Sequence, residues 1–174
     1  DIMDGTFVPN ISYGFPIVEA IAKIATKPLD AHLMIVHPEK YVDRFAKVGV
    51  QMLSFHLNAV DNAGQVLAQI RAAGMSPGLA INPDIPVEKL FPYLDQCDYV
   101  VLMSVFAGFG GQKFIEATYN RVETLKAEIE RQGVECLIQV DGGVSAANSA
   151  KLAELGADIL VAGSAVFKAD DPQA

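Results

Sequence analysis

The feature that most constrains the fold of this chain is a regular alternation of apolar runs and amphipathic segments. Short runs rich in Val, Ile and Leu are each followed by a segment in which apolar residues recur with helical spacing. Such alternation is typical of parallel strands joined by crossover helices, so we predict an α/β fold. The six runs predicted as strands are 29–35, 50–57, 75–81, 99–105, 134–140 and 157–162.

The predicted helices lie between these runs, with one more before the first of them. We expect Asp61 and Ser145 to act as N-caps, because each precedes a segment with helical spacing. The six predicted helices are 17–26, 38–47, 61–73, a short helix opened by Pro86, 116–132 and 145–155.

Two architectures fit this order of elements, a doubly wound open sheet and a β/α barrel. A nucleotide-binding open sheet should carry G-x-G-x-x-G after its first strand, and the motif is absent there. Glycine clusters instead follow the late strands, where β/α barrels form phosphate sites. We therefore predict a (β/α)8 TIM barrel as a single domain over residues 1–174.

The length of the chain conflicts with a complete barrel. An eight-stranded barrel typically takes about 250 residues, whereas this chain has 174 residues and six clear apolar runs. We therefore expect an incomplete barrel that lacks the first strand and the last helix, which would begin near residues 170–172.

Composition excludes several classes of partner. The net charge of -8 argues against nucleic acid, which proteins contact chiefly through Lys and Arg. No run of 18 apolar residues suggests a membrane span, and no leader suggests secretion. With two cysteines, a reducing cytoplasm is the expected location. A phosphorylated ligand would have to be held by local groups, because the overall field repels it.

Polar residues at predicted strand ends are the candidates for chemistry, because barrels take their catalytic groups from these ends. Asp141 follows an apolar strand, His32 lies within one, and Asp1 and Asp4 lie at a further candidate strand end. Separately, Asp141 fits an ordinary turn residue and His32 a hydrogen-bonded core residue. Together, one imidazole and two carboxylates fit a site for Zn, Fe or Mn.

Glycine-rich loops provide a second signal. Residues 108–114, Gly142–Gly143 and Gly163–Ser164 follow three successive late strands. Glycine lets backbone N–H groups approach an anion closely, so three such loops favour a phosphate site over three ordinary loops. No Lys lies inside a predicted strand, which argues against a Schiff-base aldolase.

These residues resemble the ribulose-phosphate 3-epimerase family. Residues 1–10 resemble its second-strand motif and residues 30–34 its third-strand motif. The resemblance continues, in order, through the motifs at 103–105, 108–114, 140–143 and 162–164. It implies a barrel of the ribulose-phosphate-binding type and an isomerase of the pentose phosphate pathway that interconverts D-ribulose 5-phosphate and D-xylulose 5-phosphate.

The resemblance also implies roles for individual residues. Asp1 and Asp141 would transfer protons at C3 through an enediolate, and with His32 they would bind a divalent metal ion, Zn, Fe or Mn. The loops would hold the phosphate, and three methionines would pack around the reacting carbons. The implied substrate-binding residues are His32, Gly108, Phe109, Gly110, Gly111, Gly142, Gly143, Gly163, Ser164, Met3, Met34 and Met103.

The chain departs from the family pattern in several places. Phe106–Ala107 replaces a polar residue and Pro, and Asn58 replaces an acidic residue two positions after His56. A metal-binding His of the family would precede Asp1, so we expect this chain to be less stable and less active than a longer version. The alternatives are an epimerase for a related ketose phosphate such as allulose 6-phosphate, and an inactive sugar-phosphate-binding fragment. A homo-oligomer is compatible with either.

Overall fold

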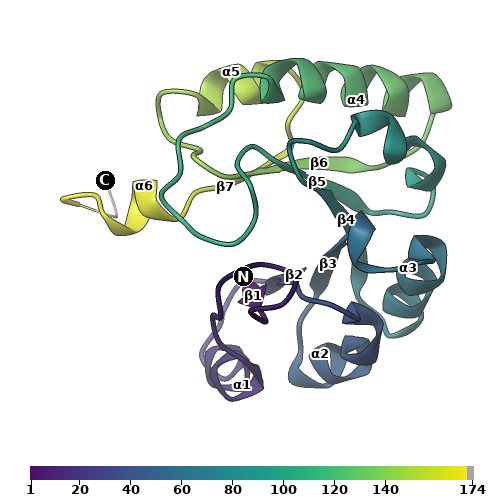
Figure 1. Ribbon diagram of the computed structural model, residues 1–174, viewed down its shortest axis with the longest axis vertical. Coiled ribbons are helices and arrows are strands. Elements are labelled where there is room, and N and C mark those ends of the chain that lie inside the picture. The colour runs from purple at the N-terminus through teal and green to yellow at the C-terminus, as the bar shows by residue number, and fades with distance from the viewer. Residues whose placement is uncertain (172–174) are drawn as a thin grey trace.

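The chain folds around one curved parallel sheet, seen in a computed structural model that describes residues 1–171 (Figure 1). Its seven strands follow one another in chain order across the sheet. They are β1 (Ile2–Met3), β2 (Asp30–Met34), β3 (Met52–His56), β4 (Ser76–Ile81), β5 (Tyr99–Met103), β6 (Leu137–Asp141) and β7 (Ile159–Val161). The α/β prediction is confirmed. Six of the seven strands were predicted. The strand that was missed is β1, whose two residues are too few to form a periodic apolar run.

The described residues form the helices α1 (Phe15–Ala22), α2 (Val42–Val48), α3 (Ala63–Ala72), α4 (Thr118–Gln132), α5 (Ser149–Glu154) and α6 (Ser164–Phe167). Helices α1 to α5 lie on the outer, convex side of the sheet, and α6 extends beyond β7 (Figure 1). Short 3-10 helices add η1 (Pro38–Lys40), η2 (Leu57–Ala59), η3 (Val87–Lys89) and η4 (Phe91–Tyr93). In the described part of the chain, no helix is both long and apolar enough to cross a membrane.

Both predicted N-caps are wrong, because an asparagine closer to the helix precedes it in each case. Only the first of these asparagines caps its helix through its side chain. The side chain of Asn62, not Asp61, accepts a hydrogen bond of 3.1 Å from the N–H of Gln65. Asn148 precedes α5, and its Oδ1 accepts a 2.9 Å hydrogen bond from the N–H of Ser145, which therefore lies in a turn.

One further predicted helix differs in form. The segment opened by Pro86 forms the successive 3-10 helices η3 and η4 instead of an α-helix. The last helix of the barrel was expected to be missing, and Asp170 and Asp171 do not lie in a helix. Pro172 and the last two residues of the predicted 1–174 domain lie outside the described residues.

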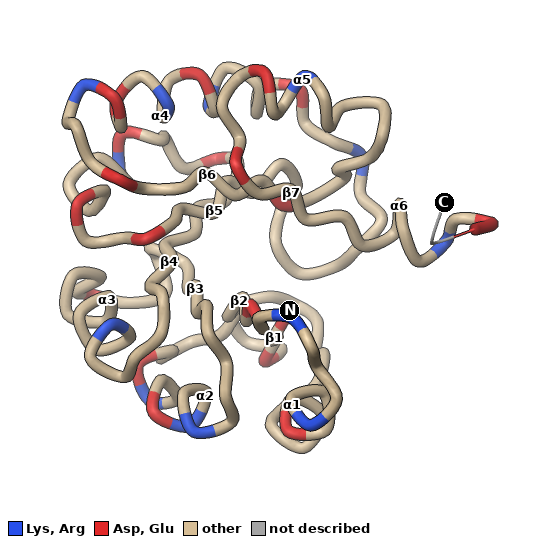
Figure 2. Tube along the Cα trace, turned by 180° about the vertical axis from the view of Figure 1, so that it is seen from behind, with Lys and Arg blue, Asp and Glu red and all other residues tan. Residues whose placement is uncertain are grey.

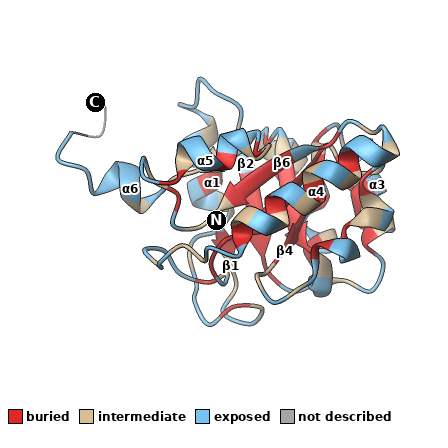
Figure 3. Cartoon of the chain, turned by 90° about the horizontal axis from the view of Figure 1, so that it is seen from above, coloured by how far each residue is buried: buried red, intermediate tan, exposed pale blue. Residues whose placement is uncertain are grey.

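The side chains of the strands alternate between two apolar layers, as the period of two in a strand requires. The outer layer packs under the helices and includes Leu33, Leu79 and Leu102. The inner layer fills the hollow of the curved sheet and includes Tyr99 and Val101. Figure 3 shows the buried sheet beneath the half-exposed helices.

Charged residues are largely confined to the helices and connecting segments (Figure 2). Within the seven described strands the only charged residues are Asp30, which begins β2, and Asp141, which ends β6. Burying a carboxylate at the end of an apolar strand costs free energy unless the carboxylate has partners. Asp141 is therefore a candidate functional residue at the carboxyl ends of the strands.

Candidate active site

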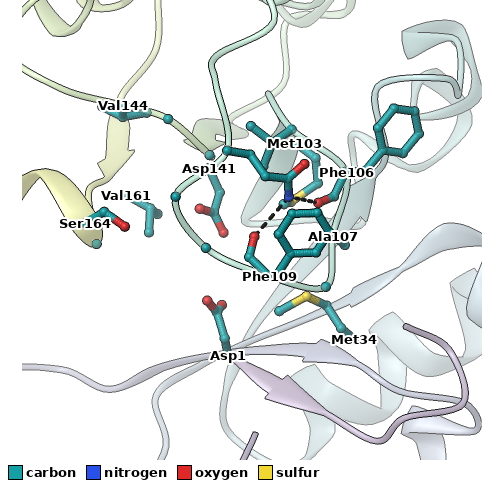
Figure 4. Close-up of a pocket in the computed structure, with 18 of the residues that line it drawn as sticks. Asp1, Met34, Met103, Phe106, Ala107, Phe109, Asp141, Val144, Val161 and Ser164 are labelled. Carbon is teal, nitrogen blue, oxygen red and sulfur yellow. Dashed lines mark hydrogen bonds between the residues drawn. The ribbon is translucent and has the colours of Figure 1, made fainter. Parts of the chain in front are cut away.

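A cavity of about 280 Å³ lies at the carboxyl ends of the strands. This is close to the lower end of the range for small-molecule pockets, roughly 300–1,000 Å³. Every site residue predicted from the sequence except His32 lines it (Figure 4). They are Asp1, Met3, Met34, Met103, Gly108, Phe109, Gly110, Gly111, Asp141, Gly142, Gly143, Gly163 and Ser164.

The two predicted carboxylates meet beside His32. Asp1 immediately precedes β1 and Asp141 ends β6, and Figure 4 shows their carboxylates pointing toward each other. The Nδ1 atom of His32 lies 3.8 Å from Oδ1 of Asp1 and 3.5 Å from Oδ2 of Asp141. One ligand atom from each residue lies within 4.8 Å of the other two, so the three could hold a metal ion.

The spacing of these atoms fits a divalent metal. Bonds from a metal to imidazole nitrogen or carboxylate oxygen are about 2.0–2.2 Å long, which places two ligands of a tetrahedral ion about 3.4 Å apart. His32 is only 4% exposed, and its Nδ1 has no hydrogen-bond partner. A buried nitrogen without a partner is unfavourable, and a bound cation would satisfy it.

His56 lies behind His32 and was not predicted as a site residue. The Nε2 atoms of the two rings are 2.9 Å apart, and the ring of Phe7 lies 5.0 Å from that of His56. Burial, and to a smaller extent the neighbouring His32, lowers the pKa of His56 from 6.5 to about 2. His56 is therefore a neutral imidazole at physiological pH. Its position at the end of β3 was the available signal.

Ser104 holds the backbone of the Asp141 turn. It follows β5 directly and is completely buried. Its hydroxyl lies within hydrogen-bonding distance of the carbonyl oxygens of Asp141, at 2.8 Å, and Gly142, and its N–H donates to the carbonyl of Asp141 at 2.8 Å. These contacts set the direction in which the Asp141 side chain leaves the sheet.

The glycine-rich loop is closed on itself by one side chain. The amide of Gln112 donates hydrogen bonds to the carbonyl oxygens of Phe106, at 2.6 Å, and Phe109, at 2.9 Å, the dashed lines of Figure 4. The N–H of Ala107 donates to Oδ1 of Asn82 at 3.1 Å. Ala107 lies where Pro was expected by resemblance, and a Pro could not make this bond.

The three glycine-containing loops converge, as predicted. A Cβ built on Gly110 or Gly111 would lie 3.9 or 3.8 Å from Oγ of Ser164. One built on Gly143, whose φ is +63°, would lie only 2.7 Å from the backbone nitrogen of Phe114. Close backbone approach of this kind requires glycine and brings N–H groups together around a small volume.

The resemblance implied that three methionines surround the substrate, and no lysine was expected within a strand. Met3 is paired with Met34 across β1 and β2, and Met103 with Asp141 across β5 and β6. All three methionines line the cavity. None of the described strands contains a lysine, so no amine is positioned within them for Schiff-base chemistry.

Several cavity-lining residues were not predicted from the sequence. They are apolar or small side chains beside the predicted ones, which carry no chemical signal of their own. They are Val105, Phe106, Ala107, Val144, Ser145, Val161 and Ala165, together with Gln112.

A β/α-barrel sheet whose strands carry at their carboxyl ends a cavity with two carboxylates beside a buried imidazole defines the class as a barrel enzyme. The profile of the ribulose-phosphate 3 epimerase family matches residues 1–167. The chain belongs to this family, whose members are isomerases.

Curated relatives agree over nearly the whole chain. The ribulose-phosphate 3-epimerase of a Synechocystis strain is 45% identical over 97% of this chain and 74% of its own length. That of Bacillus subtilis is 42% identical over 98% of this chain and 79% of its own. The chloroplastic ribulose-5-phosphate-3-epimerase of Arabidopsis thaliana is 43% identical over 98% of this chain and 62% of its own.

Solved structures support the fold. A mutant tryptophan synthase α-subunit from Pyrococcus furiosus matches with a TM-score of 0.67 at 21% identity. The match covers 87% of this chain and 62% of that one. At this identity the likeness concerns the fold alone, and it agrees with a barrel that is open between β1 and β7.

Proposed function

We propose that this chain inverts C3 of D-ribulose 5-phosphate to give D-xylulose 5-phosphate. The observation that carries the proposal is the approach of Asp1 and Asp141 to one another beside His32, at the wall of a cavity with converging glycine loops. The names of the relatives support the same reaction.

Inversion beside a ketone requires removal of a proton from one face of C3 and return of a proton to the other. Asp1 and Asp141 come from strands on opposite sides of the open barrel, so a substrate between them presents one face to each. One carboxylate accepts the proton from C3 and the other, already protonated, donates to the opposite face. An enediolate separates the two transfers, and the substrate need not turn over.

We propose that Asp1, His32 and Asp141 hold a divalent metal ion, Zn, Fe or Mn. When bound, such an ion would stabilise the negative charge that develops on the substrate oxygens. The unpartnered Nδ1 of His32 and its distances of 3.5 and 3.8 Å to the carboxylates support this assignment.

The loops and methionines would position the substrate. Backbone N–H groups of the loops at 108–111, 142–143 and 163–164 would bind the phosphate and so keep C3 between the carboxylates. Met3, Met34 and Met103 would cover the carbon chain and exclude water. The single domain, the pentose phosphate pathway, the cytoplasmic location and a homo-oligomer remain predictions.

Exchange at C3 in D2O, followed by proton NMR, tests the proposal. Ribulose 5-phosphate is incubated with the chain and with Zn, Fe(II) or Mn in turn, with allulose 6-phosphate in parallel. Loss of the C3 proton together with formation of xylulose 5-phosphate is expected. If allulose 6-phosphate exchanged faster, it would become the assigned substrate in place of ribulose 5-phosphate. If neither sugar exchanged with any metal, epimerase activity in this chain would be contradicted.

A further inference from the structure

The hydrogen bond between His32 and His56 is a buried polar contact that the proposed reaction does not use. His32 is 4% exposed and His56 is fully buried, and their Nε2 atoms are 2.9 Å apart. The rings are inclined by 19° with centroids 4.9 Å apart. A hydrogen bond between two ring nitrogens needs one proton and one lone pair, so only one of the two rings donates.

The direction of this hydrogen bond determines which nitrogen of His32 is free. If His56 donated, a neutral His32 would carry its proton on Nδ1 and present an N–H to the Asp1 and Asp141 cluster. If His32 donates from Nε2, its Nδ1 keeps a lone pair on the side of the carboxylates, 3.5 Å from Asp141. Only the second arrangement leaves a nitrogen that can bind a cation.

The surroundings of His56 leave its Nε2 free to accept from His32, and no other hydrogen bond of its ring is found among the described residues. The ring of Phe7 covers it, and its Nδ1 is buried without a hydrogen-bond partner. Each strand residue is held by the sheet, with His56 opposite Ala80 and His32 opposite Ser54. The sheet therefore fixes the points from which both rings leave the backbone, and among the described residues the hydrogen-bond partner of the His56 ring is His32.

We propose that His56 is a positioning residue that accepts the Nε2–H of His32 and thereby holds His32 in the tautomer whose Nδ1 can bind a divalent cation. The inference rests on the proposed metal site and adds a residue to it. Groups behind a metal ligand commonly fix its tautomer, and their removal typically weakens metal binding by about 10- to 100-fold. The group that accepts a hydrogen bond from a metal-binding histidine is usually a carboxylate or a carbonyl, whereas here it is the imidazole of His56.

Zinc affinity measured by competition with a chelator tests this role. We expect His56→Phe, which keeps a ring but has no acceptor, to weaken zinc binding by about 10- to 100-fold. We expect His56→Gln, whose Oε1 can accept from His32, to stay within about threefold of the unaltered protein. His37→Asn is the control, because His37 is 63% exposed and lies outside the cluster. Equal affinities in all four proteins would overturn the proposal, as would equal losses in the Phe and Gln variants.

The protonation pattern can be determined without any variant. The chain has three histidines, so 15N NMR of the zinc-loaded protein resolves each ring. His56 is expected to be neutral, with its proton on Nδ1 and its Nε2 bare, and a proton on Nε2 of His56 would overturn the proposal. If the unaltered protein bound none of zinc, Fe(II) and Mn, the proposed metal site itself would be contradicted. Tight zinc binding that is indifferent to His56 would overturn only the present inference.

Discussion

The hydroxyl of Tyr99 donates a 3.0 Å hydrogen bond to Oδ1 of Asp30, which joins β5 to β2 across the hollow of the curved sheet. The side chain of Gln139 on β6 donates to the other oxygen of Asp30, also at 3.0 Å. These strands are not neighbours, so the contacts exist only in the curled sheet. They connect the two halves of the fold beneath the cavity.

Gly78 makes this crossing feasible. A Cβ on Gly78 would lie 2.6 Å from Cε2 of Tyr99. We expect Gly78→Ala to lower the free energy of unfolding by about 3 kcal/mol, because the ring would have to move in a packed interior. Urea denaturation measures the change. Gly14→Ala is the control, since nothing lies within 4 Å of its added Cβ, and equal destabilisation by both variants would contradict the steric explanation.

Replacement of Asp141 should remove proton transfer without removing the fold. We expect Asp141→Asn to slow exchange at C3 by about 10²- to 10⁴-fold, because an amide is neither acid nor base here. The D2O experiment measures the rate. Asp61→Asn is the matched control, as Asp61 lies outside the cavity, and it should exchange at the normal rate. A normal rate in Asp141→Asn would rule out this carboxylate as an acid or base.

Ser104 is expected to act through the Asp141 turn. Ser104→Ala removes the one hydroxyl hydrogen that is shared between the carbonyl oxygens of Asp141 and Gly142, which should cost about 1–2 kcal/mol of stability. A turn displaced in this way should also slow C3 exchange by about tenfold. Ser149→Ala at the start of α5 serves as the comparison and should change neither quantity. If Ser104→Ala altered stability alone, the turn would not depend on this hydroxyl for its catalytic position.

A comparison of Gly143→Ala with Gly133→Ala separates the effect of backbone strain from the effect of steric crowding. Their φ angles are +63° and +66°, but only Gly143 has neighbours within 4 Å of an added Cβ. Both Ala variants should therefore lose about 1 kcal/mol from backbone strain. Gly143→Ala should in addition raise KM for ribulose 5-phosphate by at least about tenfold, because Phe114 must move away from the phosphate loops. An unchanged KM in steady-state assays would argue against phosphate binding at these loops.

Asp4 should make the fold sensitive to acid. Its Oδ2 accepts from Val36 and its Oδ1 from Thr6 and Phe7, each at 2.8 Å. Partial burial raises the pKa of Asp4, but these N–H groups together outweigh it and lower the pKa below its ordinary value. The stabilisation is therefore complete above the unfolded pKa of about 3.9 and is lost as the pH falls through the lower folded value.

We expect Asp4→Asn to cost about 1.5 kcal/mol at neutral pH, since an amide cannot accept on both sides. The difference from the unaltered protein should be constant above about pH 5 and shrink below about pH 4. Unfolding curves recorded over this range measure it. A difference that did not change with pH would show that the charge of Asp4 has no part in the effect.

Most features that depend on residues close together in the sequence were predicted, and most features that depend on distant residues were not. Apolar periodicity is a local property, so it predicted six of the seven strands and the parallel order. It missed β1, whose two residues are paired only through β2. Capping depends on a single side-chain geometry: Asn62 caps α3 in place of Asp61, and Asn148, not Ser145, is the residue that precedes α5.

Asp1, Asp141 and the glycine loops were candidates because they lie at predicted strand ends, which parallel strands bring to one edge. His32 was a candidate because it is an imidazole within an apolar strand. The sequence by itself therefore determined the α/β class and the chemical types at the site. The tertiary structure alone decided which partners those groups have. His56 behind His32, Ser104 beneath Asp141 and Tyr99 above Gly78 are contacts between residues 21 or more positions apart. No local pattern encodes such contacts, because they arise only when neighbouring strands pair in the register of the folded sheet.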